Sequence, residues 1–411
     1  MRRRQLLQSA LTAASTSLLW SPTGHASPGT DHDAYFLKLN DSLKRSGPGR
    51  PVMLIDTARM NHNIDKIVGS VGRDKTYRTV VKSLPSVPLL QHVTQRAGTQ
   101  ALMVFHQPFL NTIANTFPNS DALLGKPMPV RAVEHFYAQL TSSKFQPEQQ
   151  VQWLIDTQER LQQYLQMARR LGITMQCNFE IDVGLRRGGL PEPAALTQAL
   201  KLVDQYPQHL KVSGLMGYEP HLTGMKAELN HPAVRSVLGL YDGFKNALKS
   251  NGMDINKLTF NGAGSHTLRI YERDHTMNDL SAGSGVVMPT DFDTHHLRDN
   301  RPALFIATPI LKRYEGNPII PGASGDMGRL YYIYGGKWKA KMASPAATGE
   351  PIYESTNQSP VTTSKNSNLQ VDDYMFLRPT QSEFVMLQFG DLLTVTDGEI
   401  DQHWPVFHQT G

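Results

Sequence analysis

A lysine ends one of the apolar runs of the sequence and is the first candidate for chemistry. The segment TYRTVVKSLPSVPLL, residues 76–90, places Lys82 directly after Val80 and Val81. An amine that apolar neighbours shield from water is a nucleophile that can form a Schiff base with an aldehyde. The alternative is a lysine that extends its ammonium group to the surface, which is the commoner outcome for this residue type. Lys82 alone therefore does not decide between the two roles.

Two later segments place cationic and aromatic side chains after apolar runs. In FEIDVGLRRGG, residues 179–189, a glycine-rich turn presents Arg186 and Arg187, which could bind an anionic or phenolic oxygen or be solvated. The segment VSGLMGYEPH ends an apolar run at Tyr218, which could stack on a planar ring or fill the core. Both segments are compatible with a site for a flat, oxygen-bearing ligand.

Two further segments have the composition of phosphate-binding loops. Glycine lets backbone N–H groups approach a phosphate closely, and a serine hydroxyl adds another donor. The segments are LTFNGAGSHT and LSAGSGVV, and their candidate residues are Asn261, Gly262, Gly264, Ser265, Gly283 and Ser284. Pyridoxal 5'-phosphate carries an aldehyde, a phenolic oxygen, a flat ring and a phosphate, so the segments together match this cofactor.

The elements that must position these residues alternate between apolar runs and amphipathic helices. About eight such runs, the first at residues 51–57, occur within residues 48–290 and predict a (β/α)8 barrel. A doubly wound sheet is the alternative, but no G-x-G-x-x-G segment opens a helix after an early strand. Reactive groups of a barrel lie at the carboxyl ends of its strands, which is where Lys82 and the later segments fall.

The rest of the chain, residues 291–411, has the pattern of strands. Alternating apolar segments and glycine-containing turns predict an all-β domain there, and we find no helix signal in it. Residues 31–47 have the pattern of a helix that could pack against this domain. The expected fold is therefore an α/β protein, a barrel followed by a β-domain.

The composition is that of a globular protein. Hydrophobic residues make up 39% of the 411 residues and charged residues 19%, unlike a disordered chain. The net charge is +5, but three arginines stand in the first four residues, and no basic patch predicts nucleic-acid binding. The single cysteine, Cys177, excludes an intrachain disulfide and a cysteine-based zinc cluster, and its apolar neighbours favour a buried role.

Residues 1–26 have the layout of an export signal. A basic start is followed by a mildly apolar stretch and by small residues at Gly24 and Ala26. The run from Arg3 to Leu7 resembles the twin-arginine export pattern, with an ordinary secretory signal as the alternative. The segment is too short and too polar for a permanent anchor. We therefore expect cleavage after Ala26 and a periplasmic protein that is not bound to a membrane.

On these segments the chain resembles the pyridoxal-phosphate enzymes of the alanine racemase fold, in particular the branch of D-threonine aldolase and D-serine dehydratase. The resemblance covers most of residues 48–290, from PVMLIDTARMNHNI through RTVVKSLPSVPLL, IDVGLRRGG, GLMGYEPH and NGAGSHT to NDLSAGSGVV. It implies that Lys82 carries the cofactor as a Schiff base, that Arg187 meets its phenolic oxygen and that Tyr218 stacks on its ring. It also implies phosphate binding by the two glycine-rich segments, and a homodimer whose active site lies between one subunit's barrel and the other's β-domain.

The chain departs from that branch in its metal ligands. Members usually carry a His-x-Cys or His-x-Asp pair near the C-terminus that binds a divalent metal, and no such pair occurs here. A bound divalent metal is therefore left open. The residues of metal-binding type that could replace the pair are His403 and His408, and the group Asp291, Asp293, His295 and His296.

The expected function is a lyase that uses pyridoxal phosphate and acts on a small D-3-hydroxy amino acid. It would cleave Cα–Cβ as an aldolase, or eliminate the β-hydroxyl as a dehydratase with Lys82 as the base. For the β-hydroxyl proton the sequence offers only His266 as a candidate. The alternatives are an amino-acid racemase and a non-catalytic binder of cofactor or amino acid. Ser281 stands where racemases place an arginine, and a racemase's second base could come only from Tyr331, Tyr332 or Tyr334 by residue type.

Overall fold

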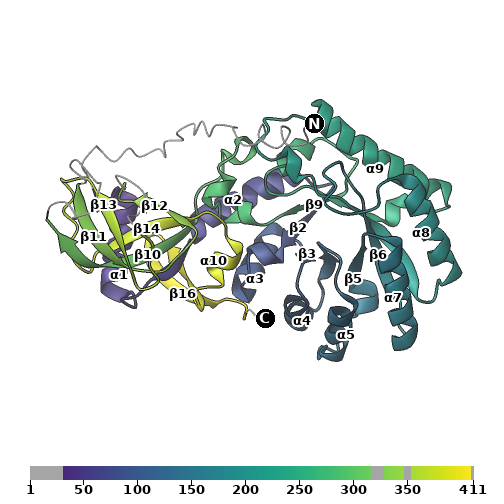
Figure 1. Cartoon of the computed structure of the whole chain (residues 1–411), viewed down its shortest axis with the longest axis horizontal. Helices are drawn as coiled ribbons and strands as arrows, with labels where there is room; N and C mark the ends of the chain where they lie inside the picture. Colours follow the sequence, from purple (N-terminus) through teal and green to yellow (C-terminus); the bar gives the residue numbers. More distant parts are fainter. Residues whose placement is uncertain (1–30, 316–327, 347–352, 409–411) are drawn as a thin grey trace, which may run out of the picture.

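The computed structural model describes residues 31–315, 328–346 and 353–408, and the predicted export signal, residues 1–26, lies outside them. The described residues form a closed parallel barrel and, beside it, a domain built on a mostly antiparallel sheet (Figure 1). Within these ranges no helix is long and apolar enough to cross a membrane.

Eight parallel strands close the barrel in chain order, and helices surround it (Figure 1), which confirms the predicted (β/α)8 architecture. The strands are β2 (Thr76–Val80), β3 (Ala101–Val104), β4 (Asp121–Leu124), β5 (Val151–Ile155), β6 (Met175–Glu180), β7 (Leu210–Met216), β8 (Thr259–Gly262) and β9 (Asp279–Ala282). The helices are α2 (Thr57–Val71), α3 (Val87–Ala97), α4 (Gln107–Thr116), α5 (Val130–Ala138), α6 (Pro147–Gln150), α7 (Gln158–Leu171), α8 (Pro193–Gln205) and α9 (Pro232–Ser250).

Helix α7 illustrates how the sequence pattern builds the outer layer of the barrel. The Thr157 hydroxyl caps its start by accepting from the Arg160 N–H, and Gly172 ends it in a left-handed conformation. Its predicted apolar residues recur three and four positions apart, so they share one buried face: Leu161, Tyr164, Leu165 and Ala168. In the neighbouring strand β6, Cys177 is buried as predicted, and burial raises the pKa of its thiol to about 12.

One predicted barrel strand belongs to the other domain. Strand β1 (Val52–Asp56) lies in the β-domain sheet, antiparallel to β10 and parallel to β15, and β9 takes the eighth place in the barrel. All five β1 residues are buried. A continuous apolar run fits a barrel strand and the centre of another covered sheet equally well, so the sequence pattern could not separate the two.

The β-domain sheet has the order β12-β14-β10-β1-β15-β16, and β11 and β13 extend it from β10. Helix α1 (Ala34–Ser46) packs on this sheet through Phe36, Leu39 and Leu43, which join a core cluster with Val52 and Leu54. The remaining strands are β10 (Leu304–Tyr314), β11 (Arg329–Tyr334), β12 (Ala340–Ser344), β13 (Gln358–Thr363), β14 (Tyr374–Pro379), β15 (Asp391–Thr396) and β16 (Glu399–Pro405).

A short helix interrupts the region where the sequence predicted only strands. Helix α10 (Glu383–Met386) lies at the junction of the two parts (Figure 1). Its residues Val385 and Met386 are buried in the same core cluster as the barrel residues. A four-residue helix is too short to produce a recognisable helical spacing of apolar residues. The sequence pattern of this region therefore indicated only the surrounding strands.

Candidate active site

A cavity of about 400 Å³ lies at the carboxyl ends of the barrel strands, and its volume suits a small-molecule ligand. Gly262 does not line it, because this glycine packs against Met277, whose Sδ would lie 2.2 Å from an added Cβ. The other predicted site residues meet at this cavity, although they lie up to about two hundred positions apart in the sequence. The predicted residues that line the cavity are Lys82, Arg187, Tyr218, Asn261, Gly264, Ser265, Gly283 and Ser284.

Lys82 presents its amine to this cavity. It follows β2 within a single helical turn, Val81–Ser83, and Val80 and Val81 are buried. The amine nitrogen lies 5.1 Å from the centre of the Phe105 ring, which is a cation–π contact. Lys82 also forms an ion pair with the carboxylate of Glu383. Its amine is therefore held by specific contacts inside the cavity and does not extend into open solvent.

Glu383 is a cavity residue that no sequence motif indicated. It begins α10 of the β-domain and is the one carboxylate among the described residues that line the cavity. It lies 301 positions from Lys82 in a segment with the pattern of a strand, so neither spacing nor periodicity connected the two. The available signal was a serine followed by an acidic residue, which can start a helix but is too common to be specific.

Arg187 and Tyr218 lie together at the cavity wall. The guanidinium carbon of Arg187 is 5.0 Å from the centre of the Tyr218 ring, within the range of a cation–π contact. Gly264 lies against the same ring, since an added Cβ would come within 2.7 Å of Tyr218 Cε2. Burial raises the pKa of Tyr218, so its hydroxyl is neutral near pH 7. The wall therefore offers a cation and a neutral aromatic ring.

One hydroxyl group joins the two glycine-rich loops. Ser265 Oγ accepts hydrogen bonds from the backbone N–H groups of Gly283 at 3.2 Å and Gly285 at 3.0 Å, which leaves its own hydrogen to donate to a ligand. Gly283 leaves no room for a side chain, because an added Cβ would lie 2.7 Å from Ser83 Cβ. Ser284 Oγ likewise accepts from Ser382, so the two loops form a compact cradle whose Ser265 and Ser284 hydroxyls can donate to a phosphate.

Pyridoxal phosphate fits the chemistry of the cavity. The cradle offers neutral donors to a phosphate, Lys82 offers an amine to an aldehyde, and the Arg187–Tyr218 wall offers a cation and a ring to a flat phenolic ligand. A side chain at Gly264 would displace the Tyr218 ring, and one at Gly283 would displace Ser83 and Val80, so both glycines are needed for the observed wall and cradle. The residues present are therefore those that could hold this cofactor.

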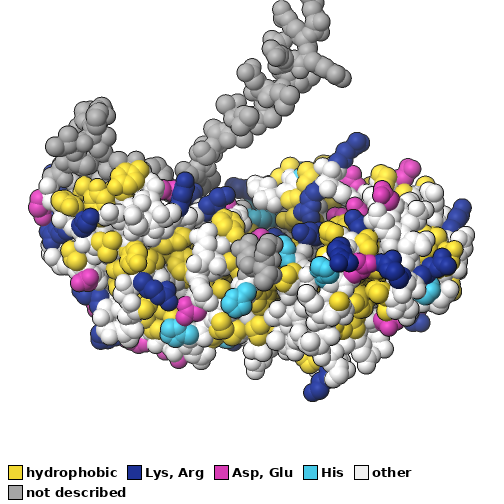
Figure 2. All heavy atoms as spheres, turned by 60° about the horizontal axis from the view of Figure 1, so that its bottom comes forward, with side chains coloured by type: hydrophobic (Ala, Val, Ile, Leu, Met, Phe, Trp, Pro, Cys, Tyr) yellow, Lys and Arg dark blue, Asp and Glu magenta, His cyan; other side chains and the backbone are white. Residues whose placement is uncertain are grey.

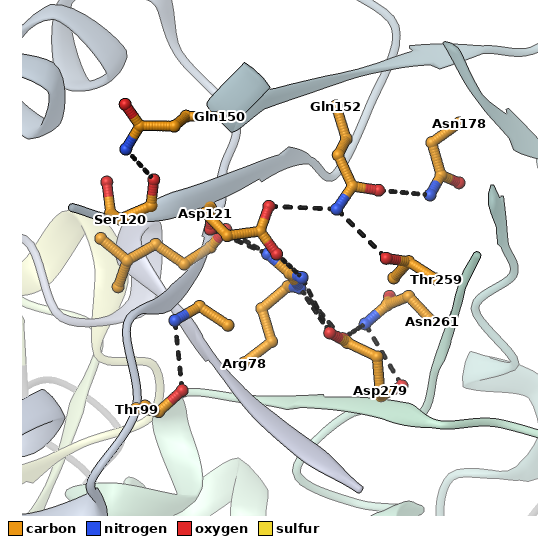
Figure 3. A network of polar contacts seen from close by, with 12 residues as sticks. Arg78, Thr99, Ser120, Asp121, Gln150, Gln152, Asn178, Thr259, Asn261 and Asp279 are labelled. Atoms are coloured by element: carbon orange, nitrogen blue, oxygen red, sulfur yellow. Dashed lines mark hydrogen bonds and ion pairs between the residues drawn. The ribbon is translucent and has the colours of Figure 1, made fainter. Parts of the chain in front are cut away.

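Asn261 lies at the cavity, but its amide is committed to the barrel interior (Figure 3). Asn261 Nδ2 donates to Asp279 Oδ1 at 2.5 Å and to Ser281 Oγ at 2.8 Å. Asp279 also accepts from the buried guanidinium of Arg78 at 2.8 Å. Asn261 therefore orients Ser281, and these contacts differ from the expected contact with a phosphate. Because Ser281 accepts from Asn261 and lines the cavity, it can donate its hydroxyl hydrogen to a ligand there.

His266, the sequence candidate for a base, also lines the cavity. Its ring stacks on Phe292 with centroids 4.2 Å apart, and Nδ1 lies 3.4 Å from the Thr294 hydroxyl. Burial lowers the pKa of His266 to about 4, so the imidazole is neutral near pH 7. A group with so low a pKa is a weak acceptor of the proton of a hydroxyl group.

Three of the residues considered as metal ligands make other contacts. His403 pairs with Asp391, and Asp293 pairs with Arg378. His295 contacts the guanidinium of Arg298. Across residues 31–315, 328–346 and 353–408, no group of three or more His, Cys, Asp or Glu residues could hold a metal ion.

Glu219, the residue after Tyr218, holds one of the loops that line the cavity. Its side chain is fully buried, and its Oε1 accepts from the Thr267 hydroxyl at 2.6 Å. That hydroxyl oxygen in turn accepts from the backbone N–H of Gly264 at 3.1 Å. Burial raises the pKa of Glu219 to about 7. Glu219 is therefore a buried acid that holds the first glycine-rich loop.

Replacing Glu219 by glutamine is expected to weaken the pH dependence of stability. The folded protein keeps this proton up to about pH 7 and the unfolded chain releases it near 4.5, so stability falls as pH rises through this window. Glutamine does not titrate. Between about pH 5 and about pH 8 the free energy of unfolding of the variant should therefore fall by about 2–3 kcal/mol less than that of the wild type. Urea denaturation of both proteins at the two pH values measures this. An equal loss in both would contradict it.

The fold and this cavity define a class of protein. An eight-stranded parallel barrel that presents an amine, an arginine–tyrosine wall and a phosphate-type cradle is the architecture of a barrel enzyme built around pyridoxal phosphate. The family model described as "Alanine racemase, N-terminal domain" matches residues 55–290, which is more than half of the chain. The chain therefore belongs to this family, whose members use pyridoxal phosphate, and the resemblance found in the sequence is confirmed.

Solved structures share this fold at low sequence identity. D-threonine aldolase from Filomicrobium marinum is 14% identical with a TM-score of 0.68, and the match covers 87% of this chain and 96% of the aldolase. D-threo-3-hydroxyaspartate dehydratase from Delftia sp. HT23 is 14% identical with a TM-score of 0.68, over 90% and 100% of the two chains. Alanine racemase from Clostridium difficile 630 is 15% identical with a TM-score of 0.67, over 87% and 99%. A search of curated proteins found no significant match.

Proposed function

We propose that this protein is a pyridoxal-phosphate-dependent lyase that acts on a small D-3-hydroxy amino acid. The observation that carries the proposal is the cavity in which Lys82 lies together with the cradle of Ser265 and Gly283. Two of the structurally similar proteins, the D-threonine aldolase and the D-threo-3-hydroxyaspartate dehydratase, are named for substrates of this class. The sequence resemblance to the aldolase and dehydratase branch supports the same substrate class.

The roles of the residues follow from their positions. The two glycine-rich loops would hold the phosphate of the cofactor, Arg187 would bind its phenolic oxygen, and Tyr218 would stack on its ring. When bound, pyridoxal phosphate takes up the electron pair released at Cα, which lowers the barrier to breaking a bond there. Lys82 is the covalent attachment point and, when its amine is free, the base that holds the Cα proton. Ser281 donates a neutral hydrogen bond into the cavity, oriented by Asn261.

A racemase is the second candidate, because alanine racemases share the fold. Of the tyrosines that could supply a second base, Tyr331 is fully buried with its hydroxyl 2.9 Å from Ser367 Oγ, whereas Tyr334 is exposed. One observation favours the lyase. Ser281 lines the cavity with a neutral hydroxyl, where a racemase would place an arginine.

We also propose an exported, periplasmic homodimer. The location rests on the export-signal pattern of residues 1–26. The dimer is supported by apolar side chains on the β-domain, on the left of Figure 2, since such surfaces mark interfaces. The large apolar residues exposed on α1 and the β-domain are Leu37, Leu311, Tyr314, Tyr334, Tyr353, Val371 and Phe384.

An assay on the purified chain with added pyridoxal phosphate tests the function. With D-3-hydroxy amino acids, an aldolase should release an aldehyde and glycine, and a dehydratase should release a keto acid and ammonia. Exchange at Cα in deuterated water with inversion, and without product release, would identify a racemase. Bound cofactor with none of these reactions would identify a non-catalytic binder. Failure to bind the cofactor at all would contradict the proposal.

A further inference from the structure

The contact between Lys82 and Glu383 joins the two parts of the chain inside the cavity. Lys82 follows the first barrel strand, whereas Glu383 begins the short helix of the β-domain. Their side chains are 31% and 32% exposed, so both charged groups are open to a ligand in the cavity. Glu383 Oε1 also lies 3.5 Å from Ser83 Oγ. A substrate that reacts next to Lys82 therefore also meets a carboxylate.

Hydrogen bonds to the barrel loops hold Glu383 in this place. Ser382, which precedes it, donates to the hydroxyl of Ser284 in the second glycine-rich loop at 2.9 Å. The buried guanidinium of Arg378 donates to the backbone carbonyl of Met288 at 2.7 Å. The segment that carries Glu383 is thus fastened to the same loop that forms the phosphate cradle. Such support is what a reacting group needs to keep its geometry.

We propose that Glu383 is the acid–base residue for the β-oxygen of the substrate, and that its contact with Lys82 passes the proton between this oxygen and Cα. The inference rests on the proposed lyase function, in which a proton must move at both atoms. Lys82 serves Cα, and a second group must serve the β-oxygen. Glu383 is the one carboxylate among the described lining residues, whereas His266 is a weak base.

Lys82 and Glu383 together account for every proton that moves in the dehydratase reaction. Lys82 Nζ takes the proton from Cα, and a proton of the resulting ammonium passes to Glu383 Oε1. Glu383 then gives this proton to the β-oxygen as the Cβ–O bond breaks, so that water leaves with the electrons of that bond. The electron pair of the former Cα–H bond forms the double bond between Cα and Cβ.

In the aldolase reaction the same two residues pass the proton in the opposite direction, from the β-oxygen to Cα. Glu383 takes the β-hydroxyl proton, and the electrons of that O–H bond form the carbonyl of the aldehyde as the Cα–Cβ bond breaks. The electron pair of the broken bond stays with Cα. The proton passes from Glu383 to Lys82, which delivers it to Cα, so that glycine is formed. Neither direction needs a further acid or base.

The variant Glu383→Gln separates the chemistry at the two atoms. It should still attach pyridoxal phosphate to Lys82, measured by borohydride reduction and peptide mass spectrometry. It should still exchange the Cα proton of D-alanine, which has no β-oxygen, with deuterated water at a rate within about threefold of the wild type. Release of aldehyde or keto acid from a 3-hydroxy substrate should fall by about 10²–10⁴-fold. Glu383→Asp, which keeps the carboxylate, should recover part of this loss.

The matched control is Glu399→Gln, which removes an exposed carboxylate of the same domain that pairs with Arg45 on the outer surface. It should leave attachment, exchange and product release unchanged. Product release by Glu383→Gln within about threefold of the wild type would overturn the inference. So would a joint loss of attachment, exchange and release, because Glu383 would then act only through Lys82 or the fold. A wild-type chain that attaches the cofactor but releases no product would instead contradict the lyase function itself.

Discussion

Replacing Lys82 by alanine is expected to abolish covalent attachment of pyridoxal phosphate and to reduce product release by at least about 10⁴-fold. The variant removes the one amine that the cavity places against Phe105 and Glu383. In the proposed function it removes the attachment point and the Cα base together, which explains the size of the effect. The measurements are the visible absorbance of the protein with added cofactor, borohydride trapping, and product release.

The matched control is Lys126→Ala. Lys126 lines the same cavity but follows a different strand, β4. This variant should still trap the cofactor on Lys82, which would show that attachment depends on one position and not on any amine nearby. Trapping at the wild-type level in Lys82→Ala, or trapping on Lys126 in the wild type, would contradict the assignment of Lys82.

Replacing Arg78 by methionine is expected to reduce the free energy of unfolding by about 3–5 kcal/mol. Arg78 is 1% exposed in the barrel interior, where its guanidinium pairs with Asp279 at 2.8 Å and Asp121 at 2.6 Å (Figure 3). Methionine fills part of the volume but leaves Asp279 as a buried carboxylate without its cation. Urea denaturation of the full chain, with midpoint and slope compared, measures the loss.

A second arginine gives the comparison for Arg78. Arg96 pairs with Asp65 at the same distance of 2.6 Å, but their side chains are 40% and 57% exposed. Water solvates both charges when this pair is broken, so Arg96→Met should cost at most about 1 kcal/mol. Equal losses of unfolding free energy in the two variants would contradict the view that burial makes the Arg78 ion pairs more costly to break. The network also holds Asn261, so Arg78→Met should weaken cofactor binding as well.

The architecture and the order of the site segments could be predicted because they depend on local patterns. Apolar runs separated by amphipathic helices predict a barrel, and residues after those runs must meet at its mouth. Lys82 was a weak candidate until the later arginine, tyrosine and glycine segments were considered with it. The prediction failed for β1, which lies in the β-domain sheet while β9 completes the barrel. An apolar run does not indicate which of two buried sheets it joins.

The role of Asn261 shows a second limit. Its place in a glycine-rich segment pointed to a phosphate, but its amide bonds to Asp279 and Ser281 in the barrel interior. Which way a side chain points from such a segment depends on the partners around it. These partners come from another strand, so the segment itself does not specify them.

The sequence by itself determined the barrel, the following β-domain, the amine at Lys82 and the glycine-rich loops. Each depends on residue types and short spacings that act within one segment. Only the tertiary structure decided that Glu383 of the β-domain reaches the amine of Lys82, and that β1 leaves the barrel. Contacts of this kind join residues hundreds of positions apart, and they form because both domains bury their apolar faces together. The long-range packing therefore selects the partner that Lys82 meets in the cavity.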